Sequence, residues 1–166
     1  MKNKKALYLA QGGVIAALYV VLTYICSMMG LSSGVIQVRF SEALTILPLF
    51  TPAAVLGLFV GCLLSNLLTG AVIWDVIFGS LATLAGAVFT RLLRKKSPFL
   101  APVPPILANA LVVPLVLIYA YGVTDAWWFL VLTVGAGEVI SCGVLGMVLY
   151  FALRKNAHVI FGQQNA

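Results

Sequence analysis

Four acidic side chains are the residues of this chain best suited to bind a ligand or move a proton: Glu42, Asp75, Asp125 and Glu138. Glu138 lies near the middle of a long apolar segment. An ionisable group at that depth in a membrane costs several kcal/mol unless it faces a polar cavity or a partner. We therefore interpret Glu138 as a ligand-binding carboxylate. The alternative is a protonated glutamic acid that forms a hydrogen bond with a neighbouring helix.

Arg39 and Glu42 form a second candidate pair, because a spacing of three residues lets two side chains share one helix face. They form either an interfacial ion pair or, since Arg39 is the only cation expected on the outer side of the membrane, a site for a polar or anionic ligand group. Asp75 and Asp125 each open a predicted helix, a position typical of N-caps. Asp75, next to Trp74, is also a candidate ligand contact.

Amide and indole side chains add further candidates. Asn66 and Asn109 offer hydrogen-bond donors and acceptors to a ligand, or they join neighbouring helices. Trp74, Trp127 and Trp128 lie at predicted outer boundaries, where an aromatic belt is the usual role. Stacking of Trp74 or Trp127 on a planar ligand is the second interpretation.

Several kinds of catalytic and metal site are excluded by what the sequence lacks. It has no G-x-x-x-x-G-K-[ST] phosphate loop and no H-E-x-x-H motif, and its one histidine, His158, lies in the C-terminal tail. No membrane-embedded histidine or lysine is available to activate a nucleophile. Cys26, Cys62 and Cys142 lack metal-ligand spacing and are interpreted as small apolar residues. We predict no catalytic residue, no metal site and no cofactor in this chain.

The composition requires lipid as the solvent. Of the 166 residues, 63% are hydrophobic and 8% are charged, and the mean hydropathy is +1.12. Soluble domains are about 45–50% apolar and about 25% charged. The sequence therefore predicts an all-α integral membrane protein with a single membrane domain over residues 1–166. The apolar segment after the N-terminal lysines is too long for a signal peptide, so we expect it to remain as the first helix.

Six transmembrane helices are predicted, at residues 7–28, 41–50, 53–69, 75–93, 99–121 and 126–153. The motif Gly57-x-x-x-Gly61 in the third helix predicts close approach to another helix. Prolines in the fifth helix predict kinks, because proline lacks the N–H that a helix needs. These are Pro102, Pro104, Pro105 and Pro114.

The basic residues support a topology with both termini in the cytoplasm. Six crossings place nine of the lysines and arginines on the cytoplasmic face and leave only Arg39 outside, as the positive-inside rule predicts. The nine are Lys2, Lys4, Lys5, Arg91, Arg94, Lys95, Lys96, Arg154 and Lys155. The net charge of +6 therefore reports topology rather than binding to nucleic acid.

The first predicted helix carries a stripe of small residues, Ala6, Ala10, Gly13 and Ala17, on one face. Such a stripe lets another helix pack closely. That helix belongs either to a partner protein or to this bundle, and the spacing is compatible with both.

The chain resembles the QueT-type queuosine-precursor transporter family over nearly its whole length, most strongly over Val38 to Ala87, through the patterns VRFSEALTILP and WD-x-x-FG-x-x-ATL. Members of that family are S components of energy-coupling factor transporters: six-helix membrane proteins that bind a vitamin-like molecule from outside. The resemblance implies partners, namely a transmembrane coupling protein and two ATPases that use ATP and Mg²⁺. It also implies that the small-residue stripe contacts the coupling protein, with Gly13 in place of an alanine.

The resemblance further implies a 7-deazaguanine substrate, which is a precursor base, queuine or queuosine. A carboxylate can accept the paired N–H donors of its guanine-like edge in charge-assisted hydrogen bonds. Glu138 is the first choice for this carboxylate, followed by Glu42 or Asp75, with Asn66 or Asn109 at the carbonyl side and an aromatic ring over the heterocycle. Other possibilities are an S component for another vitamin, a stand-alone carrier, and a structural or assembly membrane protein.

Overall fold

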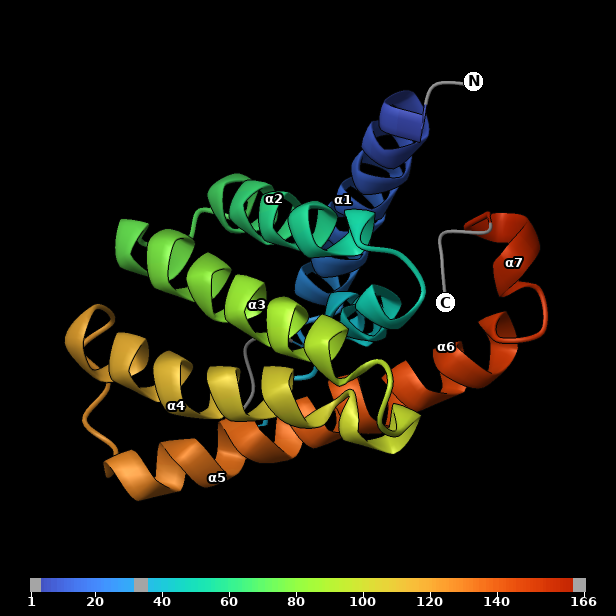
Figure 1. The fold of residues 1–166 in the computed structure, drawn as a ribbon. Coiled ribbons are helices and arrows are strands. Elements are labelled where there is room, and N and C mark those ends of the chain that lie inside the picture. Colours follow the sequence, from blue (N-terminus) through green and yellow to red (C-terminus); the bar gives the residue numbers. More distant parts are fainter. Residues whose placement is uncertain (1–3, 32–35, 163–166) are drawn as a thin grey trace.

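The computed structural model describes residues 4–31 and 36–162, and this part of the chain folds into helices and loops without a strand (Figure 1). The α-helices are α1 Lys4–Met28, α2 Ala53–Leu68, α3 Ile73–Leu93, α4 Val103–Tyr119, α5 Trp127–Glu138, α6 Gly146–Leu153 and α7 Ala157–Ile160. Two 3-10 helices, η1 Phe40–Leu49 and η2 Pro98–Leu100, and a π-helix, η3 Val139–Leu145, accompany them. The segments α5, η3 and α6 form one continuous helix.

Four of these helical segments are long and apolar enough to cross a membrane: Lys5–Met28, Ile73–Leu93, Pro98–Tyr119 and Trp127–Leu153. Many of their large apolar side chains are exposed, as lipid contact requires. The other two predicted spans are short apolar helices, η1 and α2. A 16-residue α-helix such as α2 reaches about 24 Å, which is less than the about 30 Å of a bilayer core. The chain is a helical membrane protein with four long apolar helices.

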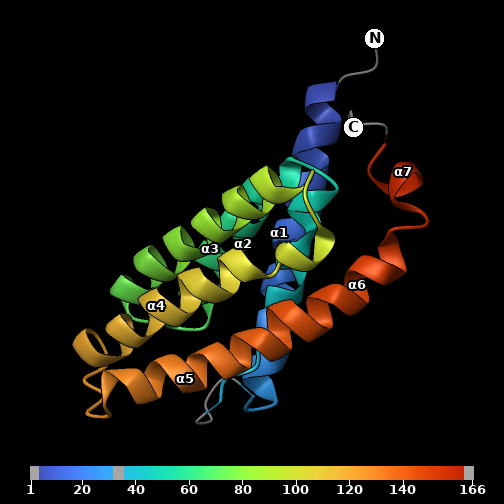
Figure 2. The ribbon, with the colours of Figure 1, turned by 60° about the horizontal axis from the view of Figure 1, so that its bottom comes forward.

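The helices α2, α3, α4 and α5 lie side by side in chain order, and α1 crosses them at a steep angle (Figures 1 and 2). α1 packs on α2 through the predicted glycine motif. A Cβ at Gly57 would lie 2.7 Å from the carbonyl oxygen of Gly12, and a Cβ at Gly61 would lie 2.7 Å from the Cβ of Tyr19. The structure therefore confirms that the glycines allow close approach, and it identifies α1 as the partner.

The small-residue stripe lies on the opposite face of α1. Ala6, Ala10, Gly13 and Ala17 are all exposed, and a Cβ at Gly13 would meet nothing within 4 Å. Ala10 also lines an apolar groove of about 410 Å³ between α1, η1 and the end of the chain. Within the described residues no helix packs closely on the stripe, and its contact with a partner protein stays a prediction.

The second predicted helix is a 3-10 helix rather than an α-helix. Pro48 lies inside η1 and has no N–H for a helical hydrogen bond. Arg91 of α3 donates from Nη1 to the carbonyl oxygens of Pro48, at 2.9 Å, and Leu49, at 3.3 Å. These bonds satisfy carbonyls at the end of η1 and hold the buried segment against α3. A 3-10 run of ten residues is uncommon and often marks a functional or strained segment.

Two further expectations require correction. The fifth α-helix begins at Val103 rather than at residue 99, after the short η2 and the N-cap Pro102, and Pro104 and Pro105 lie in its first turn, where proline is tolerated. Asp75 and Asp125 are not N-caps. The N-caps of α3 and α5 are Val72 and Ala126, and neither makes a side-chain capping hydrogen bond.

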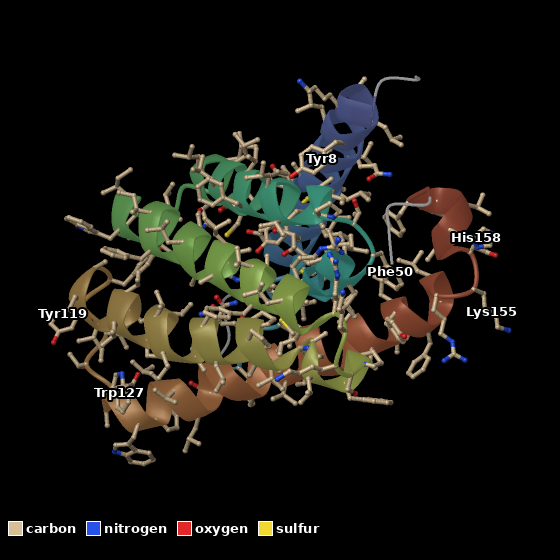
Figure 3. The ribbon with its side chains drawn as sticks, in the orientation of Figure 1. Tyr8, Phe50, Tyr119, Trp127, Lys155 and His158 are labelled. Carbon is tan, nitrogen blue, oxygen red and sulfur yellow. The ribbon has the colours of Figure 1, made fainter. Side chains whose placement is uncertain are left out.

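The start of α1 and the end of the described chain lie at the same end of the bundle (Figure 2). Gln11 of α1 joins them, because its Nε2 donates to the carbonyl oxygen of Phe161 at 3.1 Å. Tyr8, Lys155 and His158 lie at this end, whereas Tyr119 and Trp127 lie at the other (Figure 3). Of the nine basic residues predicted on one face, Lys2 lies outside the described residues.

Candidate binding site

A small polar cavity lies where α2, α3, α4 and α5 meet the segment before η1. Its lining residues come from far-separated parts of the sequence: Gln37, Arg39, Glu42, Cys62, Asp75, Gly79, Thr83, Asn109, Val113, Val134 and Glu138. The free volume is about 20 Å³, which is room for about one water molecule. The cavity is therefore closed around its polar side chains in this conformation.

A second cavity of about 240 Å³ adjoins the first and shares Gln37, Arg39, Asp75 and Val113 with it. Its remaining lining residues are mostly apolar, namely Val116, Leu117 and Val123, together with Tyr121. We call the first the inner cavity and the second the outer cavity.

Glu42 is the most heavily hydrogen-bonded carboxylate in the inner cavity. The Tyr19 hydroxyl of α1 donates to Oε1 of Glu42. Asn109 Nδ2 of α4 lies 3.5 Å from Oε2, and Cys142 Sγ of η3 lies 3.9 Å from the same oxygen. Glu42 is 2% exposed, so these donors replace the water that the carboxylate loses on burial.

Glu138 faces Glu42 across the inner cavity and has fewer partners. It is the last residue of α5, directly before the π-helix η3. The Cys142 thiol lies 3.2 Å from its Oε2. A carboxylate oxygen of Glu42, a carboxylate oxygen of Glu138 and the Cys142 Sγ all lie within 4.8 Å of one another. Extra π-helical residues often occur at functional sites, and here the π-helix carries Cys142 to a position between the two carboxyl groups.

Asp75 joins the inner and outer cavities. The Tyr121 hydroxyl donates to Asp75 Oδ2 at 3.2 Å, and the backbone N–H of Val72 donates to the Tyr121 oxygen at 3.3 Å. Burial raises the pKa of Tyr121 above its ordinary value, so the hydroxyl remains a donor at neutral pH. Asn66 Nδ2 donates to the backbone carbonyl oxygen of Asp75 at 3.3 Å.

The backbone at Arg39 is held by side chains of η3 and α1. Its N–H donates to Ser141 Oγ at 3.1 Å, and the next N–H, that of Phe40, contacts Cys26 Sγ at 3.1 Å. Two residues earlier, Gln37 passes directly over α5 at Gly137. A Cβ on Gly137 would overlap the Gln37 carbonyl oxygen and lie 3.0 Å from its carbonyl carbon. The chain path that brings Gln37 and Arg39 to the cavity therefore depends on a glycine.

A model of the family described as QueT transporter matches residues 9–155 of this chain. The match covers most of the sequence and includes every residue that lines the inner cavity. The chain belongs to the QueT transporter family. This membership confirms the family that the sequence motifs predict.

The "Queuosine precursor transporter QueT" of Lactococcus lactis subsp. cremoris (strain MG1363) is 37% identical to this chain over 84 residues. The alignment covers 51% of this chain and 49% of the relative, so the similarity spans about half of each protein. No solved structure matches the chain.

The structure brings most of the predicted site residues of this QueT family member together. Arg39, Glu42, Asp75, Asn109 and Glu138 all line the inner cavity, and Asn66 lies behind Asp75. Two predicted residues lie elsewhere. Trp74 is 55% exposed and stacks on Phe78 at a centroid distance of 6.0 Å, and Trp127 is 47% exposed.

Sequence reasoning missed several residues that contact the cavity carboxylates. Tyr19 lies in an uninterrupted apolar run, and its hydroxyl gave no sign that it would reach Glu42. Cys62 and Cys142 were interpreted as small apolar residues, but Cys62 lines the cavity and Cys142 contacts both glutamates. The spacing of four residues between Glu138 and Cys142 was the one available signal, because residues at that spacing lie on one helix face.

Proposed function

We propose that this chain binds a queuosine-related 7-deazaguanine in the inner cavity and is the substrate-binding S component of an energy-coupling factor importer. In this proposal it is a multi-pass protein of the cell membrane with both termini in the cytoplasm. Membership of the QueT transporter family supports a queuosine-related substrate. The name of the Lactococcus lactis relative, a queuosine precursor transporter, supports the same class.

The observation that carries the proposal is the set of polar side chains gathered inside an apolar bundle. Glu42 and Glu138 are 2% and 8% exposed, and Asp75 and Asn109 are equally buried. They come from η1, α5, α3 and α4, so no local structure requires them to meet. Ionisable groups inside a membrane protein commonly mark the path of a substrate. A flat heterocycle with several donors and acceptors suits such a lining.

A binding pose follows from the hydrogen bonds already formed. Tyr19, Asn109 and Cys142 occupy much of the Glu42 carboxylate, whereas Glu138 keeps more free acceptor capacity. Glu138 is therefore our choice to accept the paired N–H donors of the guanine-like edge. In this pose the Asn109 amide meets the neighbouring carbonyl of the ligand. Tyr121, in the outer cavity, is the aromatic ring nearest to such a ligand among the described lining residues.

Binding requires the inner cavity to open. Pockets for small molecules measure about 300–1,000 Å³, whereas the inner cavity has about 20 Å³ and the outer cavity about 240 Å³. Gln37 and Arg39 belong to both linings, and they lie in a loop rather than in a helix. Displacement of this loop would join the cavities and admit a bicyclic ring from the end of the bundle that carries Tyr121.

The exposed face of α1 supports a membrane partner. Ala6, Ala10, Gly13 and Ala17 allow a foreign helix to approach the α1 backbone closely, and none of them is covered by the described chain. We assign this face to the transmembrane coupling protein. ATP and Mg²⁺ would be used by the two partner ATPases.

Membrane vesicles provide the test. Vesicles containing this chain alone should bind a 7-deazaguanine in a saturable manner but should not accumulate it. Accumulation should require the coupling protein, both ATPases and ATP. Accumulation by the chain alone would identify a stand-alone carrier, and tight binding of another vitamin would reassign the substrate. An absence of saturable binding to purines, deazapurines and vitamins would favour a structural or assembly protein.

A further inference from the structure

We infer that the cavity carboxyl groups form a proton-binding site: Glu138 carries a proton in the empty cavity, and a ligand that occupies Glu138 releases this proton. The first half of the inference concerns the empty protein and stands on its own. The second half rests on the proposed function, because it needs a ligand whose N–H groups meet Glu138.

Two carboxyl groups lie unusually close together in the inner cavity. An oxygen of Glu42, an oxygen of Glu138 and the Cys142 sulfur lie within 4.8 Å of one another. Both glutamates are at least nine-tenths buried. Two carboxylates that share a buried site do not both ionise, because each negative charge disfavours the other and neither can be hydrated.

The charged and titratable groups around the pair do not supply enough positive charge. They are Tyr19 of α1, Arg39 before η1, Cys62 of α2, Asp75 of α3 and Cys142 of η3, while α4 contributes the neutral Asn109. Arg39 is the only basic residue among those that line the inner and outer cavities. One guanidinium therefore faces three carboxyl groups. With all three ionised, the buried site would carry a net negative charge with little water to stabilise it.

Hydrogen bonding decides which carboxyl group keeps the proton. Glu42 accepts from the Tyr19 hydroxyl and has Asn109 and Cys142 beside its other oxygen. Asp75 accepts from Tyr121 at the edge of the outer cavity. Donors that bond a carboxylate favour its charged form. Glu138 shares the weak Cys142 thiol and the Asn109 amide with Glu42. Among the described residues it has no counterpart of the Tyr19 hydroxyl, so the proton resides on Glu138.

Ligand binding changes this balance. A protonated carboxyl group offers one donor and a reduced acceptor capacity, whereas an ionised carboxylate accepts two N–H bonds at once. A guanine-like edge would thus replace the proton with two donors of its own. The proton passes to water through the outer cavity, and the ligand keeps its covalent hydrogens. Binding becomes stronger as the pH rises until Glu138 is ionised in the empty protein, and is then independent of pH.

Infrared spectroscopy of the ligand-free, full-length chain tests the first half. At neutral pH we expect the carbonyl-stretch band of a protonated carboxylic acid, and we expect this band to be lost on titration to alkaline pH. It should be retained in Asp125→Asn, which changes an exposed acid outside the cavity, and absent in Glu138→Gln. No such band in the wild-type protein would overturn the inference, whether or not the variants fold. A band that survives in Glu138→Gln but disappears in Glu42→Gln would overturn the assignment to Glu138.

Calorimetry with 7-deazaguanine in buffers of different ionisation enthalpy tests the second half. We expect release of about one proton per ligand and an affinity that increases about tenfold for each pH unit below the titration. Binding without proton release and without pH dependence would overturn the release, while leaving the proposed substrate class intact. If no deazaguanine binds, the proposed function fails, and the infrared result alone decides whether the proton site exists.

Discussion

The carbonyl group of Gln37 occupies the space that a side chain at Gly137 would need. This close crossing fixes the loop before η1 against α5 and sets the position of Arg39 two residues later. Glu138, the residue after the crossing point, faces the inner cavity. The loop and the candidate ligand-binding carboxylate are therefore positioned by the same contact.

Replacing Gly137 with alanine should displace this loop, because the new Cβ would overlap the Gln37 carbonyl. We expect ligand affinity to fall by more than about tenfold, and stability to fall by about 1–3 kcal/mol, as for other overpacked sites. Calorimetry and thermal unfolding measure the two effects. Gly135→Ala is the matched control, since a Cβ there would meet only the Ala110 Cβ at 3.8 Å. Equal affinities for the two variants would show that the crossing does not position the site.

Glu138→Gln should weaken binding of a 7-deazaguanine by more than about tenfold, equivalent to about 1.4 kcal/mol. The glutamine keeps the size of the side chain but cannot accept two N–H bonds as an anion. Expression should be unchanged. The control is Asp125→Asn, at an exposed position before α5. An unaltered dissociation constant for Glu138→Gln would remove this residue from the site.

Tyr19→Phe should destabilise the protein, because the buried Glu42 loses its best-placed donor. The expected cost is about 1–3 kcal/mol, the range for a buried group left without its partner. Thermal unfolding in detergent compares this variant with Tyr24→Phe, at a position on the same helix that is 54% exposed. If both tyrosine variants unfold at the wild-type temperature, Tyr19 does not support Glu42.

Larger side chains on the exposed face of α1 should abolish transport and leave ligand binding unchanged. Ala10→Leu and Gly13→Leu add bulk on an exposed face of α1. Ligand affinity should therefore stay within about twofold of wild type, a smaller change than the loss of one hydrogen bond would cause. Transport by the assembled importer should be abolished. Ala85→Leu adds the same bulk at an exposed position of α3 and should transport normally. Loss of both binding and transport in the α1 variants would contradict a docking role for this face.

Tyr121→Phe should weaken binding by about two- to tenfold, since a hydrogen bond contributes about 0.5–1.5 kcal/mol and the Asp75 carboxylate loses its donor. The raised pKa of Tyr121 makes this effect constant across neutral pH. The Tyr121–Asp75 hydrogen bond stabilises the folded protein fully below the ordinary pKa of tyrosine, about 10. This stabilisation is lost as the pH rises through the higher pKa that Tyr121 has in the folded protein. Tyr119→Phe, at an 84% exposed position, is the control. A Tyr121→Phe affinity equal to that of Tyr119→Phe would exclude Tyr121 from the site.

The polar residues of the site were predictable because a membrane sequence contains so few of them. Glu42, Asp75, Asn109 and Glu138 stand out from apolar surroundings, and the energetic cost of burying them implies a shared cavity. The helix positions followed from hydropathy in the same way. Periodicity could not reveal that η1 is a 3-10 helix, because Pro48 and the distant Arg91 together determine how this segment ends.

Residues whose roles depend on distant contacts could not be predicted. Tyr19 and Cys142 meet Glu42 only through the packing of α1 and η3 on η1, and neither residue type is unusual in an apolar helix. Trp74 and Trp127 are ambiguous in a different way. A large aromatic ring near the end of a span is equally compatible with a ligand and with the lipid interface, and their exposure places them away from the cavity.

The π-helix Val139–Leu145 makes the long last helix sensitive to the number of its residues as well as to their identity. Each residue of an α-helix turns the chain by about 100°. Deleting one residue from η3 would let the segment relax into a regular α-helix with little rotation of the helical segments on either side, because a π-bulge accommodates one extra residue. Homologous chains that carry a single-residue gap between Glu138 and Cys142 should therefore keep the faces of the flanking helical segments, but the spacing of these two residues falls from four to three and the thiol moves relative to Glu42.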